Sequence, residues 1–357
     1  MNHAANAVFV VAKREMSKEE GEGGGEYAAK KIKLSSEATK LTDEEEQIYD
    51  RQIRLWGLAA QQRLNQAKLL LVSFSGMNIE VAKNIVLAGI GHVVVQDDRT
   101  VTEAMASSHM FLRKGVDVGR NVAESCCEGL RDMNPMIKVT ANASPLASLT
   151  DEYLGSFDVV SVHEAGCADK TRLAHINNVC RAHGKSFFCG SSRGLYAYFF
   201  EDLGDGYKCQ TLLSKKEQSD PDVYQDKVER FVPLHAALQT PLAVLQKERV
   251  HKLWLALIIV DRFNNNNGGN GSSSSGKEEL VKFAAEYVAS EKGDASKLID
   301  EDLLAHLLAV CHPPTCLLFT VVCGFDVHSH RRHNGKEAST ASQPSMRSWA
   351  ASWLRRL

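Results

Sequence analysis

The chain has 357 residues, 44% hydrophobic and 24% charged, enough to bury a large core in one large domain or two smaller ones. Its formal net charge of -2 gives no overall attraction to nucleic acid or acidic membranes, and no apolar run is long enough to cross a bilayer. We therefore expect no nucleic-acid partner and no membrane partner. Nine cysteines without a framework spacing fit a reducing compartment, and the lack of any C-x-x-C pair predicts no structural zinc. We expect no metal-binding residues in this chain.

Residues 1–41 are predicted to form a disordered arm, because they are rich in Gly, Glu, Lys and Ser and contain few large apolar side chains. The basic cluster at 30–33 in this arm is typical of a nuclear-import signal, and it is also compatible with a solvated charge run. We expect a nuclear protein on the first interpretation. Order is predicted to begin at Thr42, which stands three residues before Glu45 in a capping-box arrangement.

Residues 68–98 have the pattern of a strand, a turn, a helix and a second strand. The first strand is a continuous run of Leu and Val, as in a strand buried on both faces of a parallel sheet. Gly89 marks the end of the helix, and Asp97 follows the second strand at the distance where a dinucleotide-binding unit has its ribose-binding carboxylate. The spacing predicts a Rossmann-like nucleotide fold.

The turn of this unit lacks most of the glycines that a phosphate-binding loop uses. A G-x-G-x-x-G loop needs them for a tight turn and for close approach of the backbone to phosphate. Here the three positions are Ser73, Ser75 and Asn78, and only Gly76 lies nearby. We interpret the loop as a vestigial nucleotide site whose remaining candidate cofactor-binding residues are Gly76 and Asp97, and a variant loop that still binds nucleotide is the alternative.

Two strings identify a family resemblance. Residues 49–57 read Tyr-Asp-Arg-Gln-Ile-Arg-Leu-Trp-Gly, and residues 118–124 read Val-Gly-Arg-Asn-Val-Ala-Glu, followed by Met-Asn-Pro at 133–135. The chain resembles the ubiquitin-like-protein-activating enzymes and their bacterial ThiF and MoeB relatives, and among them the non-catalytic subunits of heterodimeric SUMO-activating enzymes. The resemblance covers residues 42–205 well and the region to about 309 loosely. It implies the ThiF/MoeB-like adenylation fold, an α/β Rossmann-like, mainly parallel sheet with helices on both faces and a small helical insertion.

The resemblance also implies a role for Arg51. In this family an arginine of the N-terminal helix reaches across the dimer to the phosphates of ATP bound by the partner, and the first arginine of the 49–57 string is Arg51. A guanidinium is always charged and can fork onto phosphate oxygens. From the residues alone, Arg51 and Arg54 could equally be solvated helix positions. ATP and Mg²⁺ are expected in the catalytic partner subunit, and no cofactor is expected to bind tightly to this chain.

Several positions depart from the catalytic members of the family. Where those members carry an Asn and then an Arg-Gln pair that orient ATP, this chain has Ser-Ser-His-Met-Phe-Leu at 107–112. Where they carry a magnesium-binding aspartate, it has His163 and Glu164. Its cysteines, including Cys189 and Cys209, lack the cationic surroundings that lower a thiol pKa. We expect a subunit without a catalytic cysteine or a complete ATP site, which supports adenylation and thioester capture of SUMO by its partner.

The expected domain organisation follows the chain. Residues 42–204 form the Rossmann-like pseudo-adenylation domain, and 205–263 a reduced, largely helical insertion region. Residues 264–276 are a flexible Asn, Gly and Ser linker, 277–310 a helical return to the core, and 311–357 a divergent, poorly ordered tail.

Three alternatives stay open. A regulatory subunit for another ubiquitin-like modifier would fit, although such chains usually carry a much longer insertion. A NAD(P)-dependent oxidoreductase is supported only by the fold and by Asp97, and the missing glycine fingerprint counts against it. A scaffold with no part in the chemistry would tolerate Arg51→Ala, whereas a phosphate-contacting arginine would not.

Overall fold

The structure is a computed structural model. It describes residues 41–164, 170–193, 196–212, 224–241, 244, 255–256, 258–260, 262–263, 276–290 and 299–310. The expectations for the arm and its basic cluster before residue 41, for the Asn, Gly and Ser segment before residue 276 and for the tail after residue 310 lie outside these residues. The chain divides into two compact units, one containing Glu22–Cys189 and Phe200–Pro233 and the other Gly190–Phe199 and Leu234–Trp349.

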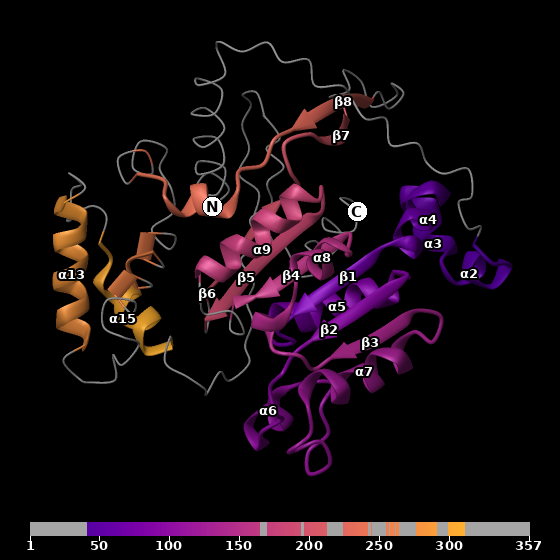
Figure 1. Cartoon of the computed structure of the whole chain (residues 1–357), viewed down its shortest axis with the longest axis horizontal. Coiled ribbons are helices and arrows are strands. Elements are labelled where there is room, and N and C mark those ends of the chain that lie inside the picture. Colours follow the sequence, from indigo (N-terminus) through magenta and orange to yellow (C-terminus); the bar gives the residue numbers. More distant parts are fainter. Residues whose placement is uncertain are drawn as a thin grey trace, which may run out of the picture. The chain divides into compact units, whose positions relative to one another are not determined.

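A six-stranded sheet forms the centre of the fold, with the strand order β3-β2-β1-β4-β5-β6 (Figure 1). Strand β1 pairs in parallel with β2 and β4, and β2 pairs in parallel with β3, so that Leu70 lies opposite both Val94 and Val160. This order and the prevailing direction are those of a doubly wound nucleotide-binding fold, which confirms the predicted fold class. The strands are β1 (Lys68–Val72), β2 (His92–Gln96), β3 (Lys138–Asn142), β4 (Val159–His163), β5 (Ser186–Arg193) and β6 (Tyr196–Asp202).

Helices connect the parallel strands. The chain moves from β1 through α5 (Met77–Leu87) to β2 and through α7 (Val122–Met133) to β3, then from β4 through α9 (Lys170–Ala182) to β5 in the opposite direction across the sheet. Right-handed crossovers therefore put α5 and α7 on one face and α9 on the other, and α5 and α7 pack against each other. The shorter helices are α6 (Glu103–Ser108), α8 (Asp151–Gly155) and the 3-10 turn η1 (Leu146–Ser148).

Three short helices precede the sheet: α2 (Asp43–Ile48), α3 (Asp50–Trp56) and α4 (Leu58–Gln66) (Figure 1). The predicted capping box is present, because the Glu45 amide donates to Thr42 Oγ1 at 3.2 Å and the Thr42 amide donates to Glu45 Oε2 at 2.8 Å. Gly57, with φ of +88°, separates α3 from α4, as its position after the apolar stripe indicates. Within the described residues, no helix combines the length and apolar character needed to cross a membrane.

The region expected to be largely helical after residue 205 begins instead with an antiparallel hairpin. Its strands are β7 (Tyr207–Leu212) and β8 (Tyr224–Glu229), paired from Tyr207 opposite Glu229 to Leu212 opposite Tyr224. Residues 226–228 of β8 are exposed, and none of the hairpin residues whose burial the structure describes is buried, so no buried apolar run among them reveals the hairpin in the sequence. Helix α10 (Leu234–Leu238) follows it in the chain.

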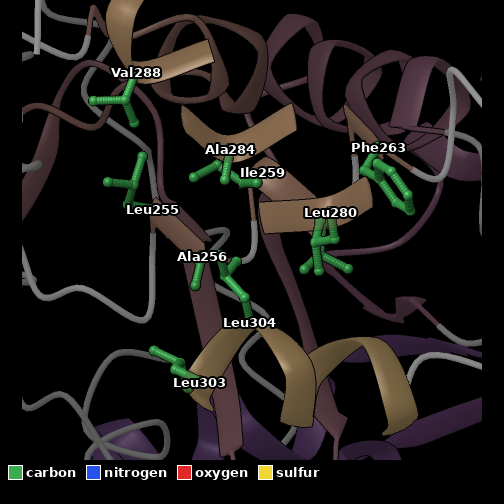
Figure 2. Packing of buried hydrophobic residues seen from close by; sticks show 10 residues of the cluster. Leu255, Ala256, Ile259, Phe263, Leu280, Ala284, Val288, Leu303 and Leu304 are labelled. Atoms are coloured by element: carbon green, nitrogen blue, oxygen red, sulfur yellow. The ribbon is translucent and has the colours of Figure 1, made fainter. Parts of the chain in front are cut away.

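The second unit has its own apolar core, between α13 (Gly276–Ser290), α15 (Glu301–Val310) and the segment 255–263 (Figure 2). Leu280, Ala284 and Val288 repeat every four residues and form one buried stripe of α13. Leu303 and Leu304 of α15 join the same cluster. The helical periodicity predicted for residues 277–310 therefore corresponds to two helices that bury their apolar faces together. The remaining members are Leu255, Ala256, Ile259, Val260 and Phe263, with Tyr198 of β6 packed against them.

Candidate functional site

The loop between β1 and α5 lies where a Rossmann fold binds phosphate. Ser73 has φ of +62°, and it is the one non-glycine with positive φ among the described residues. Gly76 follows at φ of +47° and forms the N-cap of α5. A serine in the left-handed region is strained, because its Cβ approaches the backbone. At Ser73 the backbone of the loop thus has a left-handed conformation that favours glycine, although the residue there carries a side chain.

Asn78 fills the third glycine position of the loop. Its side chain is fully buried, and its Nδ2 donates to the carbonyl oxygens of Val72 at 2.7 Å and Ser73 at 3.1 Å. Its Oδ1 accepts a hydrogen bond from Ser161 Oγ of β4 at 2.8 Å. A glycine here would allow close packing of helix on strand. In this chain an amide group instead ties the loop to β1 and β4.

Asp97 is brought to this loop, as its spacing predicts, but the protein itself occupies its carboxylate. Oδ2 accepts from the Phe74 amide at 2.8 Å and from Arg99 Nη2 at 2.6 Å, and Oδ1 accepts from Arg99 Nε at 2.9 Å. Only 3% of Asp97 is exposed. The hydrogen bonding of the Arg99 guanidinium to the Asp97 carboxylate is the main reason that the pKa of Arg99 is raised. The carboxylate expected to bind a ribose is therefore committed to an internal ion pair.

Arg99 also reaches the loop directly, because its Nη2 donates to Ser73 Oγ at 3.3 Å. One guanidinium thus connects the end of β2 with the first serine of the loop. Sequence reasoning did not single out Arg99. Its position two residues after the acidic residue was the available signal, since an arginine there can fold back onto that carboxylate.

His109 lies beneath the loop, in the segment where catalytic family members have ATP-orienting polar residues. It is buried, its Nε2 lies 2.9 Å from the Phe74 carbonyl oxygen, and the Phe111 amide donates to its Nδ1 at 3.3 Å. These two contacts require a neutral imidazole with the proton on Nε2. Burial, aided by the positive charge of Arg99, lowers the pKa of His109. His109 is therefore a neutral support of the loop rather than a cation facing a phosphate.

The buried cysteines are not placed for nucleophilic chemistry. Cys126, Cys127, Cys180 and Cys189 are all buried, whereas Cys209 is partly exposed. Burial raises the pKa of Cys127 to about 11 and that of Cys180 to about 12, and it also raises the pKa of Cys126. A thiol attacks as its thiolate, and burial favours the protonated thiol at Cys126, Cys127 and Cys180.

The residues at the position expected for a magnesium-binding aspartate also interact with other side chains of this chain. Glu164 forms an ion pair with Lys170 Nζ at 2.6 Å, and the neighbouring His163 Nδ1 lies 3.2 Å from Ser75 Oγ. The described part of the chain contains no group of three or more His, Cys, Asp or Glu side chains that could hold a metal ion. The Glu164 carboxylate is therefore paired with a lysine in this structure.

Arg51 differs from these residues, because it lies on the surface of α3. It is exposed, and none of the described residues forms an ion pair or hydrogen bond with its guanidinium. Arg54, one turn later, donates instead to Asp50 at 3.0 Å. Of the two arginines in the 49–57 string, Arg51 is the one whose charge the described structure leaves available.

Comparison with known proteins agrees with the fold and with these motifs. The model of the ThiF family matches residues 49–311. SUMO-activating enzyme subunit 1 of Danio rerio is 33% identical over 202 residues, which are 55% of this chain and 57% of the relative. SUMO-activating enzyme subunit 1B-1 of Arabidopsis thaliana is 32% identical over 228 residues, 63% of this chain and 68% of the relative. The chain thus spans between about half and two thirds of the length of these relatives.

The human SUMO-activating enzyme subunit 1 is 34% identical over 165 residues, which are 46% of each chain. A crystal structure of PaaA aligns with a TM-score of 0.38 at 21% identity, over 45% of this chain and 56% of that one. The ThiF match covers well over half of the sequence and includes the six-stranded sheet, the loop between β1 and α5, and helix α3, which carries Arg51. The chain belongs to the ThiF family, and the relatives it resembles are first subunits of SUMO-activating enzymes.

Proposed function

We propose that this chain is the non-catalytic subunit of a heterodimeric SUMO-activating enzyme and that it contributes Arg51 to an ATP site in its catalytic partner. The observation that carries the proposal is the contrast between the two candidate positions. The chain's own Asp97 is occupied by Arg99 and the Phe74 amide, while Arg51 is exposed without a partner among the described residues.

The proposed chemistry is adenylation of the C-terminal carboxylate of SUMO. That carboxylate attacks the α-phosphorus of ATP, the bond from this phosphorus to the bridging oxygen of pyrophosphate breaks, and pyrophosphate leaves. Negative charge on the phosphate oxygens is best stabilised by donors that are already in place. A guanidinium can donate two parallel hydrogen bonds to such oxygens. ATP and Mg²⁺ belong to the partner in this proposal, as does the cysteine that then captures SUMO as a thioester.

The loop between β1 and α5 supports the proposal that the partner subunit, rather than this chain, binds ATP. Ser73, Ser75 and Asn78 place side chains at the three positions where a phosphate-binding loop has glycines, and burial raises the pKa of Cys127 and Cys180. The same features weigh against the oxidoreductase alternative, because a nicotinamide dinucleotide would need the loop and the Asp97 carboxylate. The nuclear localisation that we propose rests on the basic cluster at 30–33, and a fluorescent fusion lacking it would be expected to lose nuclear enrichment.

Reconstitution tests the proposal. ATP-dependent thioester formation is measured with this chain alone, with the catalytic subunit alone and with both, each with SUMO and with a second ubiquitin-like modifier. We expect a thioester with SUMO only when both subunits are present. A thioester formed without this chain would refute the requirement for it, and activity restricted to the second modifier would identify the chain as a regulatory subunit for that modifier.

A further inference from the structure

Tyr49 is the point at which helix α3 is fixed to the core of its unit. It forms the N-cap of α3, two residues before Arg51, and only 1% of it is exposed. Its hydroxyl accepts a hydrogen bond from Asn134 Nδ2 at 2.8 Å. We infer that Tyr49 is a positioning residue for Arg51, since its ring and hydroxyl hold the first turn of α3 in the orientation that presents the guanidinium outward. This inference rests on the function proposed above.

The partner of the Tyr49 hydroxyl is itself held in place. Asn134 Nδ2 also donates to the Val86 carbonyl oxygen at 2.8 Å, and Asn134 Oδ1 accepts from the Met136 amide at 3.1 Å. Both amide hydrogens and the amide oxygen are therefore used, which leaves the Asn134 side chain one orientation. The hydroxyl of Tyr49 is bound to a fixed donor rather than to a mobile surface group.

The ring of Tyr49 is held as tightly as its hydroxyl. Gly89 lies against it with φ of +88°, and a Cβ on Gly89 would be 2.4 Å from Tyr49 Cζ. The aromatic ring thus occupies the space that this glycine leaves open. Burial is the main cause of the raised pKa of Tyr49, so its hydroxyl remains neutral and bonded.

The contacts of Tyr49 fix the first turn of α3, which carries Arg51. The Tyr49 carbonyl oxygen accepts the Ile53 amide at 2.9 Å, so the backbone of Tyr49 closes the first turn of α3, in which Arg51 lies. Among the hydrogen bonds of the described residues, the first turn of α3 is also tied to the end of α5 by the 3.5 Å contact between Gln52 Nε2 and the Leu87 carbonyl oxygen. The last residue of α3, Trp56, is linked to it through Gln61, which accepts from Trp56 Nε1 at 3.0 Å and donates to the Ala88 carbonyl oxygen at 2.8 Å. A loosened Tyr49 would therefore shift the base of the Arg51 side chain while the central sheet stays intact.

The test is a double-mutant cycle in the complex of this chain with its catalytic subunit. SUMO-dependent exchange of pyrophosphate into ATP is measured for Y49F, R51A and the double variant, with kcat and the KM for ATP resolved. Y153F is the matched control, because the Tyr153 hydroxyl also accepts from an asparagine, Asn142 Nδ2, at 3.1 Å, on a different part of the sheet. The Tm of each variant and its elution with the partner are measured alongside.

We expect Y49F to lower kcat/KM by about ten- to a hundredfold, because a misplacement of about 1 Å at a charged contact has this effect. Y49F should change the same kinetic parameter as R51A, and adding Y49F to R51A should lower the rate by less than about twofold, since the two residues act as one unit. Y153F should leave the rate unchanged.

Three results would overturn the inference while the proposed function survives: losses from Y49F and R51A that multiply in the double variant, a Y49F rate equal to that of the unmodified complex, or a Y49F chain that no longer elutes with its partner. If instead R51A itself exchanges pyrophosphate at the unmodified rate, the proposed role of Arg51 fails, and the positioning role of Tyr49 fails with it.

Discussion

At the scale of single residues, surroundings decide what a charged side chain can do. Asp97 and Arg51 were both candidates for contact with a nucleotide. The first is buried and held by Arg99 and the Phe74 amide, whereas the second is exposed and has no partner among the described residues. A carboxylate that accepts several internal hydrogen bonds would have to lose them before binding a ribose. Asp97 is thus part of the architecture of the loop.

Arg99→Ala should lower the free energy of unfolding by about 2 kcal/mol, because it removes the ion pair of the buried Asp97 carboxylate and leaves it with two backbone donors, the amides of Phe74 and of residue 99. Urea unfolding of the purified chain measures this change. Arg54→Ala is the control, since Arg54 pairs with Asp50 at an exposed site where 77% of the arginine side chain faces solvent. Equal losses for the two variants would contradict the structural role given to Arg99.

Stability should fall as the pH falls below about 6.5, the ordinary pKa of histidine. Burial lowers the folded-state pKa of His109 and of His92, so the unfolded chain binds more protons than the folded chain between the folded and unfolded pKa values. The stabilisation is complete above the unfolded pKa and is lost as the pH falls toward the folded one. Urea unfolding between pH 7.5 and pH 5 should show this slope, and His109→Gln should reduce it. A curve that is flat, or that rises toward pH 5, would contradict the neutral form assigned to His109.

At the scale of elements, the sequence predicts helices and strands whose apolar side chains follow a regular pattern. It misses features that depend on contacts between distant segments. The continuous apolar run of β1 predicts a strand of a parallel sheet, because both its faces are buried. The hairpin of β7 and β8 is not predicted, since none of its side chains of described burial is buried and its pairing is made by the backbone. Spacing places Asp97 at the loop correctly, but the contacts of Arg99, Asn78 and His109 that fill the loop arise only when distant segments meet.

The packing of α3 against the end of α5 gives a prediction at this scale. Gly89 and Gly57 both have φ of +88°, but an added Cβ would strike the Tyr49 ring at Gly89 and meet open space at Gly57. Gly57 has ψ of 156°, which with its φ is a conformation essentially restricted to glycine, so Gly57→Ala should lower the unfolding free energy by about 1–3 kcal/mol through backbone strain alone. Gly89→Ala should lower it by a further amount of about 1–3 kcal/mol through overpacking. Urea unfolding compares the two variants, and equal losses of unfolding free energy would mean that the Tyr49 ring moves aside without an energetic cost.

At the scale of the whole molecule, the chain keeps the scaffold of a nucleotide-binding enzyme and fills its own loop. The six-stranded order and the ThiF match establish the scaffold. The serine and asparagine side chains, the ion pair of Asp97 with Arg99 and the ion pair of Glu164 lie at the positions where a catalytic relative is expected to have loop glycines and unpaired carboxylates. In the function proposed above, the chain takes part in adenylation by contributing Arg51 to another subunit.

Comparing Arg51→Ala with Arg54→Ala in the reconstituted heterodimer tests this claim most directly. Both arginines lie on α3, and only Arg54 is paired within the chain. We expect Arg51→Ala to lower the rate of SUMO-dependent pyrophosphate exchange by about a hundredfold or more while the dimer stays intact, because it removes a charged donor from the transition state. Arg54→Ala should leave the rate unchanged. Equal rates for the two variants would mean that this chain contributes no charged group to the reaction.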